Sequence, residues 1–239
     1  MPKLIGDLAL VIGAYLLGSF PYILLLSRAK GFNLSQGEDF HISTWRKVGR
    51  LEGTSGIVVD LLKGVLPILA GFLFDFSLAV TATAGVAATI GQMWPVFQKF
   101  NGEKGNTTGT GMVLTLTSFI GTDALVAFGY CLLCFAIGFF VRTVPRFMAK
   151  NQTLSEKLKF GGPVSNSLPA GMLAGFAATP LASWLLNQPI ELTSATAAVF
   201  FLIVIRRLTA NLGKDLESPR TSVGRILLNR FLFDRSYFK

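Results

Sequence analysis

Charged residues are scarce in this chain, and so are histidine and cysteine. Only 15% of the 239 residues are Asp, Glu, Lys or Arg, whereas 51% are hydrophobic. That balance is too apolar for an ordinary soluble domain, so lipid must be the solvent for most of the chain. A bilayer core takes roughly 20 apolar residues per helix, so about seven helices and short loops would use the whole length. The sequence therefore predicts a single all-α polytopic membrane domain over residues 1–239.

The common catalytic and metal-binding patterns are also missing. The sequence contains neither a Gly-x-Ser-x-Gly nucleophile elbow nor a His-Glu-x-x-His motif, and a single histidine, His41, excludes a histidine-based metal cluster. We interpret His41 as an ordinary polar residue of a loop. Cys131 and Cys134 lie in an apolar stretch without a partner histidine or cysteine, which favours packing over zinc or redox chemistry. We expect no metal and no cofactor.

Apolar segments make up most of the sequence. Because they are wholly apolar rather than alternating, they predict membrane helices and not a β-barrel. Segment 112–120 is too short to span alone, so it is expected to be re-entrant or tilted. The first segment carries Asp7 and lacks a cleavage site, which indicates a retained helix rather than a signal peptide. The predicted segments are 4–27, 56–74, 78–97, 112–120, 122–141, 164–186 and 189–205.

The basic residues are unevenly distributed among the connections. If successive apolar segments alternate sides, every lysine and arginine except Lys3 and Lys63 falls on one face of the membrane. By the positive-inside rule that face is cytoplasmic, which places the N-terminus outside and the C-terminus in the cytoplasm. This face would hold a basic loop at 142–163 and a basic amphipathic tail at 206–239. Part of the tail is expected to lie as a helix in the headgroup layer.

The formal net charge of +9 is compatible with three kinds of partner: nucleic acid, anionic lipid or an anionic substrate. Nucleic acid is excluded because the charges border membrane helices. Membrane lipids and an anionic substrate remain as the expected partners.

A glycine-rich segment between the third and fourth apolar segments offers a site for an anion. It reads Asn101-Gly-Glu-Lys-Gly-Asn-Thr-Thr108. Glycines let main-chain N–H groups approach a phosphate, a lysine supplies positive charge, and the N-terminus of a following helix adds a partial positive charge. The alternative is a glycine turn whose lysine extends to the membrane surface. The candidate phosphate ligands are Gly102, Lys104, Gly105 and Thr108.

Two charges lie inside the second apolar segment, where charges are costly. Asp60 and Lys63 are three residues apart, so they share one face of a helix. We expect them to border a polar cavity, with a purely structural ion pair as the alternative.

Several motifs together resemble the bacterial acyl-phosphate-dependent glycerol-3-phosphate acyltransferases. They are Ala14-Tyr-Leu-Leu-Gly-Ser-Phe-Pro21, Asp60-Leu-Leu-Lys-Gly64, Gly91-Gln-Met-Trp-Pro-Val-Phe97 and Gly102-Glu-Lys-Gly105. Their order and spacing resemble that family from about residue 4 to residue 111. Further along, Arg207 and Asn211 match an Arg-x-x-x-Asn in the family's last motif.

The resemblance implies a seven-helix enzyme of the bacterial plasma membrane that transfers an acyl group from acyl phosphate to glycerol 3-phosphate, giving lysophosphatidic acid. Acyl phosphate is an activated mixed anhydride, so no covalent nucleophile is needed. A soluble acyl-phosphate synthase is a possible partner on the basic face. The catalytic residues that the resemblance implies are Lys104, Arg46, Arg207 and Asn211, with Asp60 and Lys63 bracing the cavity.

Some family positions differ in this chain. The family's loop motif, Gly-Ser-Gly-Asn-x-Gly-Ala-Thr-Asn, should fall at 36–44, where this chain reads Gln-Gly-Glu-Asp-Phe-His-Ile-Ser-Thr. The family histidine after Gly91 is Gln92, and the second glycine of Gly-Gly-Lys-Gly is Glu103, a carboxylate beside the expected phosphate site. A second hypothesis is therefore a non-catalytic relative that binds an anionic lipid or a lipid-synthesis partner. The sequence leaves open whether His41 has taken over a lost role.

Overall fold

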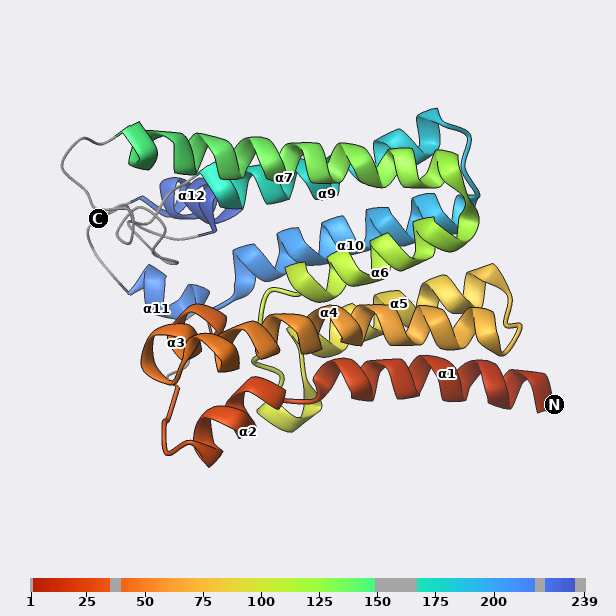
Figure 1. The fold of residues 1–239 in the computed structure, drawn as a ribbon, viewed down its shortest axis with the longest axis horizontal. Coiled ribbons are helices and arrows are strands. Elements are labelled where there is room, and N and C mark those ends of the chain that lie inside the picture. The colour runs from red at the N-terminus through yellow and green to blue at the C-terminus, as the bar shows by residue number, and fades with distance from the viewer. Residues whose placement is uncertain (1, 35–39, 149–166, 218–221, 235–239) are drawn as a thin grey trace.

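The computed structural model describes residues 2–34, 40–148, 167–217 and 222–234, and within these ranges the chain is helical. The long helices run side by side along the longest axis of the molecule (Figure 1). The predicted all-α fold is confirmed. These helices are α1 (Pro2–Ser19), α4 (Arg50–Leu73), α5 (Leu78–Met93), α6 (Asn106–Ile120), α7 (Thr122–Met148), α9 (Ser167–Leu185) and α10 (Ile190–Thr209).

Short helices gather at one end of this bundle, and the start of α1 lies at the other end (Figure 1). The short helices are α2 (Tyr22–Ala29), α3 (Phe40–Lys47), α11 (Leu212–Leu216) and α12 (Val223–Phe233), and a 3-10 turn, η1 (Val96–Gln98), follows α5. Segments that are far apart in the sequence therefore meet at this end.

The first apolar segment forms two helices rather than the single one predicted over 4–27. α1 ends at Ser19 and α2 begins at Tyr22. The break falls at Pro21, because proline lacks a main-chain N–H and disfavours helical backbone at Phe20 before it. As a result, α2 turns away from the direction of α1 (Figure 1).

α6 begins earlier than the predicted segment 112–120, at Asn106, and has 15 residues. Three of its threonines satisfy their hydroxyl groups within the helix. The hydroxyls of Thr110, Thr115 and Thr117 each donate to the carbonyl four residues earlier. Polar residues can therefore extend this helix without water.

Length and composition identify candidate membrane spans among the described residues. Five segments are long and apolar enough to cross a bilayer, and they are Lys3–Ala29, Arg50–Leu73, Thr122–Val144, Ser167–Leu185 and Ile190–Thr209. α5 and α6 are shorter, with 16 and 15 residues. Toward its C-terminus, α7 continues through Arg142, so the predicted loop 142–163 starts inside a helix, and the rest of that loop, 149–163, lies outside the described residues.

Small residues let the long helices approach one another closely. A Cβ atom added to Gly64 in α4 would lie 2.0 Å from the carbonyl oxygen of Thr108 in α6. One added to Gly18 in α1 would lie equally close, 2.0 Å, to the carbonyl oxygen of Ala88 in α5. Backbone contact through small residues is a usual mode of helix association in membranes. The contact between α4 and α6 places Thr108 beside Asp60.

The bundle is apolar on the outside as well as inside. Its main core cluster includes the buried residues Ile68, Met112, Leu116, Phe176 and Val199. Large apolar side chains are also exposed along the long helices, among them Leu8, Ile12, Val58, Leu62, Leu133, Ile137, Phe140 and Phe201. An exposed apolar surface of this extent indicates contact with lipid.

Candidate active site

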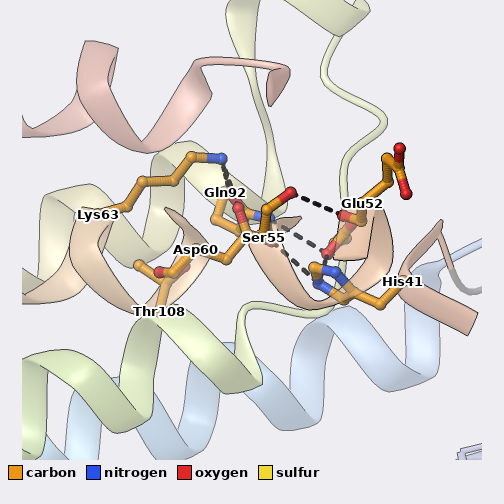
Figure 2. A network of polar contacts seen from close by, with 8 residues as sticks. His41, Glu52, Ser55, Asp60, Lys63, Gln92 and Thr108 are labelled. Carbon is orange, nitrogen blue, oxygen red and sulfur yellow. Dashed lines mark hydrogen bonds and ion pairs between the residues drawn. The ribbon is translucent and has the colours of Figure 1, made fainter. Parts of the chain in front are cut away.

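A buried network of polar side chains lies where α3, α4 and α5 meet the glycine loop, residues 101–105 (Figure 2). Within α4, the Lys63 ammonium lies 2.7 Å from the Asp60 carboxylate. Lys63 also donates a hydrogen bond of 2.7 Å to the side-chain oxygen of Gln92. The Gln92 amide in turn donates to Asp60 at 2.8 Å and to Glu103 at 3.2 Å. Gln92 therefore joins the α4 ion pair to the glycine loop.

His41 completes this network from α3, not from a loop as predicted. Its Nε2 atom lies 3.1 Å from an oxygen of Asp60 and 3.1 Å from an oxygen of Glu103. Both contacts are ion pairs when the imidazole is protonated. Burial alone lowers the pKa of His41, but the two carboxylates outweigh that effect and raise the pKa to about 10. His41 is therefore an imidazolium at pH 7.

The same residues include the group that could hold a metal ion. One ligand atom each from His41, Asp60 and Glu103 lie within 4.8 Å of one another. The surrounding donors favour a network of ion pairs instead. Lys63 and Gln92 already donate to Asp60, and the Lys63 ammonium would repel a bound cation. The expectation of no metal stays a prediction.

Main-chain hydrogen bonds and Arg206 of α10 hold the glycine loop. The N–H of Gly102 donates to the Met93 carbonyl at 3.2 Å, and the N–H of Glu103 donates to the Gln92 carbonyl at 3.1 Å. The Arg206 guanidinium donates to the Gly102 carbonyl at 2.6 Å and to the Glu103 carbonyl at 3.3 Å. The loop is thus fixed on one side to the end of α5 and on the other to the end of α10.

Two positions in this loop require glycine. A Cβ atom at Gly102 would lie 2.3 Å from the carbonyl oxygen of Gln92. Gly105 has a φ of +72°, in the left-handed region that other residues avoid, and a Cβ there would lie 2.5 Å from the Met93 side chain. Together these positions let the chain turn from the loop into the N-terminus of α6.

Arg206 is not among the residues predicted for the site. It adjoins Arg207, which the family motif selects, and its guanidinium also lies over the ring of Trp94, 5.8 Å from the ring centre. Two adjacent arginines at the end of an apolar helix are a visible signal in the sequence. Which of them faces the glycine loop depends on the rotation of α10, which the sequence does not show.

Lys104 extends from the glycine loop toward the C-terminal segment. Its ammonium lies 2.5 Å from the carboxylate of Asp234, which directly follows α12. The Lys104 side chain is 43% exposed, whereas that of Asp234 is 11% exposed. The carboxylate of Asp234 therefore pairs with the lysine that was predicted to hold a phosphate.

Thr108, the one predicted phosphate ligand that lies outside the glycine loop, is fully buried. Its hydroxyl donates to the main-chain carbonyl of Asp60 at 2.9 Å. The donor is therefore already used, and the hydroxyl oxygen has only lone pairs left to offer. A direct contact of Thr108 with phosphate stays a prediction.

The three residues predicted to contact the second anion have different surroundings. Arg46 is exposed on α3, and Asn211 is exposed after α10 with a φ of 57°. Arg207 is buried, and its guanidinium donates to the carbonyls of Pro169 at 3.0 Å and Phe231 at 3.2 Å. Their roles toward a substrate stay predictions.

Comparison with known proteins identifies the family. A sequence model described as glycerol-3-phosphate acyltransferase matches residues 8–217. The chain belongs to the glycerol-3-phosphate acyltransferase family. The resemblance read from the motifs is confirmed, and the protein is an acyltransferase of phospholipid synthesis.

Individual glycerol-3-phosphate acyltransferases show how far the similarity extends. The protein of that name from Geotalea daltonii is 33% identical over 131 residues, which cover 54% of this chain and 68% of that protein. The one from Endomicrobium trichonymphae is 25% identical over 203 residues, covering 83% of this chain and 87% of that protein.

A solved structure shows the same fold. The crystal structure of PlsY, an integral membrane glycerol 3-phosphate acyltransferase, in its glycerol 3-phosphate form matches with a TM-score of 0.63 at 23% identity. The match covers 93% of this chain and 98% of the PlsY chain. The integral membrane fold is therefore that of the acyltransferase family.

The C-terminal helix lies beyond the 8–217 match to the acyltransferase family. α12 packs on the protein through Arg230, which is buried. The Nε atom of Arg230 donates to the carbonyls of Arg207 and Leu208 at 3.1 Å, and its other nitrogens contact Asp215 and the Ala210 carbonyl. This arginine satisfies carbonyls at the end of α10, where a helix leaves them unpaired. The predicted contact of the tail with lipid headgroups stays a prediction.

Proposed function

We propose that this protein transfers an acyl group from acyl phosphate to glycerol 3-phosphate and releases lysophosphatidic acid at the bacterial plasma membrane. The observation that supports this most is the glycine loop with Lys104, held in place by Arg206 at the end of the bundle where the short helices gather. Both substrates carry a phosphate, and glycine N–H groups with a lysine suit that anion.

The reaction needs little covalent chemistry from the protein. A hydroxyl oxygen of glycerol 3-phosphate bonds to the acyl carbon, the bond between that carbon and the phosphate oxygen breaks, and inorganic phosphate leaves. The hydroxyl proton passes to a phosphate oxygen, because a phosphate with a second pKa of about 6 accepts a proton near neutral pH. The protein positions the substrates and neutralises their charge.

In this proposal the site residues form three groups with different roles. Lys104, with the main chain of Gly105, holds one phosphate. Gly102 was also predicted as a ligand, but its N–H already donates to the Met93 carbonyl, so it shapes the loop instead. Thr108 supports that loop through its bond to α4. Asp60 and Lys63 brace the cavity as the ion pair seen in α4. The second anion is held by Arg46, Arg207 and Asn211.

We also propose that all seven predicted segments enter or cross the bilayer, with the N-terminus outside and the C-terminus in the cytoplasm. Two features support this orientation. The start of α1 and the end of α12 lie at opposite ends of the bundle (Figure 1). Most basic residues in the described part of the chain fall on elements at the end with the glycine loop, where the positive-inside rule expects them. Membrane lipids and a soluble acyl-phosphate synthase are the expected partners at that end.

The activity is tested on purified protein in lipid nanodiscs, with acyl phosphate and glycerol 3-phosphate as substrates and lysophosphatidic acid measured by mass spectrometry. We expect turnover by the wild type. Lys104→Gln should lower kcat/KM by about 10- to 100-fold, because it removes a charged hydrogen bond worth about 1.5–3 kcal/mol. Lys99→Gln is the matched control, since it removes an exposed charge before the glycine loop, and it should retain wild-type activity.

The outcomes separate the parts of the proposal. Turnover with an acyl thioester but not with acyl phosphate would reject the donor. Equal activity of Lys104→Gln and Lys99→Gln would reject the phosphate loop. Wild-type product at the uncatalysed level with every donor would favour the non-catalytic, lipid-binding hypothesis.

A further inference from the structure

The glycine loop contains a charge that opposes its proposed use. Glu103 directly precedes Lys104, and a carboxylate beside a phosphate site repels the anion that the lysine attracts. Anion binding here depends on how the Glu103 carboxylate is neutralised.

The charges around Glu103 are arranged in pairs. The two carboxylates of the network, Asp60 and Glu103, are accompanied by two cations, Lys63 and His41. The Lys63 ammonium lies 2.7 Å from one carboxylate oxygen of Asp60 and donates a hydrogen bond to the side-chain oxygen of Gln92. His41 lies between Asp60 and Glu103, at 3.1 Å from an oxygen of each. The charges of these four side chains therefore sum to zero when His41 is protonated.

We propose that His41 is a positioning residue of this acyltransferase: its imidazolium neutralises Glu103 and ties the glycine loop to α3 and α4, so that Lys104 can receive a phosphate. This inference rests on the proposed function and assigns a role to a residue that the family motifs do not include.

The surroundings of His41 favour this role over that of a catalytic base. Its Nε2 faces two carboxylate oxygens, which accept protons and do not donate them, so Nε2 carries a hydrogen. Its Nδ1 faces α4, where a Cβ atom at Gly56 would lie 3.1 Å away. A substrate hydroxyl would need a free lone pair on one of these nitrogens. The pKa of about 10 agrees, because a histidine with that pKa keeps its proton at pH 7.

α3 itself is held firmly enough to act as an anchor. A Cβ atom at Gly53 of α4 would lie 2.9 Å from the Cα atom of Trp45, so the two helices are in backbone contact. Thr44 of α3 is fully buried, and its hydroxyl lies 3.2 Å from that of Ser27 in α2. The imidazolium of His41 therefore projects from a fixed element toward the loop.

The test is a charge rescue. His41→Gln removes the imidazolium charge that faces Glu103, and we expect the KM for glycerol 3-phosphate to rise about 10-fold while kcat changes less than about threefold. Adding Glu103→Gln removes the carboxylate charge that the imidazolium offset and should return KM to within about threefold of the wild-type value. Adding Glu52→Gln instead is the matched control, because this carboxylate at the start of α4 pairs with Lys30 and not with His41, and it should give no rescue.

Two results would overturn the proposal. If the double variant with Glu103→Gln binds glycerol 3-phosphate as poorly as His41→Gln alone, charge compensation is wrong. If His41→Gln lowers kcat at unchanged KM, His41 acts on the reacting atoms. A stoichiometric metal ion in the wild type that is lost in His41→Gln, measured by mass spectrometry of the purified protein, would also overturn it in favour of a metal site.

A measurement without turnover keeps this inference separate from the proposed function. The chain has a single histidine, so one imidazole signal in the NMR spectrum of an untagged protein belongs to His41. We expect that signal to remain that of an imidazolium up to about pH 9, and to titrate at lower pH in Glu103→Gln. Binding of inorganic phosphate, measured by calorimetry, should weaken in His41→Gln and recover in the double variant. If the wild type is inactive, these two measurements still decide the role of His41.

Discussion

At the scale of single residues, His41 makes the folding stability depend on pH. Asp60 and Glu103 face its Nε2 atom, and Lys63 lies on the other oxygen of Asp60. The folded-state pKa of about 10 lies above the ordinary value of 6.5, so the folded protein keeps a proton that the unfolded chain loses. The stabilisation is therefore complete below pH 6.5 and is lost as pH rises through about 10.

Thermal unfolding of the wild type and His41→Gln checks this dependence. We expect the difference between their midpoint temperatures to be largest near pH 6 and to narrow steadily toward pH 10. We compare the difference between the two midpoint temperatures because the other titratable groups shift the stability of both proteins equally. A gap that widens as pH rises would contradict a raised pKa.

Only part of this network could be predicted from the sequence. The pairing of Asp60 with Lys63 follows from their spacing, since residues three apart share a helical face. The roles of His41, Gln92 and Glu103 do not follow, because these residues come from separate segments and meet only when α3, α5 and the glycine loop pack on α4. Spacing along the chain carries no information on such contacts.

At the scale of helices, α12 adds a feature that the family match does not cover. It docks through Arg230 at the end of α10 and so brings Asp234 onto Lys104. If Lys104 holds a phosphate as proposed, the Asp234 carboxylate competes with that phosphate for this lysine. We then expect the C-terminal segment to weaken substrate binding.

Asp234→Asn should consequently lower the KM for glycerol 3-phosphate. We expect a decrease of about two- to fivefold, the range that corresponds to a partly exposed ion pair of about 0.4–1 kcal/mol. Glu217→Gln, which removes an exposed carboxylate from the end of α11, is the control and should leave KM unchanged. An increase in KM for Asp234→Asn would show that the carboxylate supports the lysine instead of competing for it.

Helix positions were more predictable than site contacts, and the exceptions have physical causes. Each predicted apolar segment overlaps one of the long helices, because a membrane helix needs a sufficient length of apolar residues. Hydropathy fails at Pro21, where a stereochemical break interrupts an apolar run. It also fails at 106–111, where Thr110 bonds to its own helix and Thr108 bonds to α4, although both appear polar in the sequence.

At the scale of the whole molecule, the orientation in the membrane rests on whether the short helix α6 crosses the bilayer. Single cysteines at Lys99 and Asp123, in a background without Cys131 and Cys134, test this with a membrane-impermeant thiol reagent on intact cells. We expect labelling at position 123 from outside and at position 99 only after the membrane is opened. Labelling of both from one side would reject a crossing by α6.

The contact between Lys104 and Asp234 also has a consequence for the order of events during synthesis. The glycine loop leaves the ribosome and reaches the membrane well before α12 is translated. Lys104 therefore spends the intervening time without the Asp234 carboxylate. The competition that we propose between Asp234 and a phosphate begins only once α12 has been made and has docked.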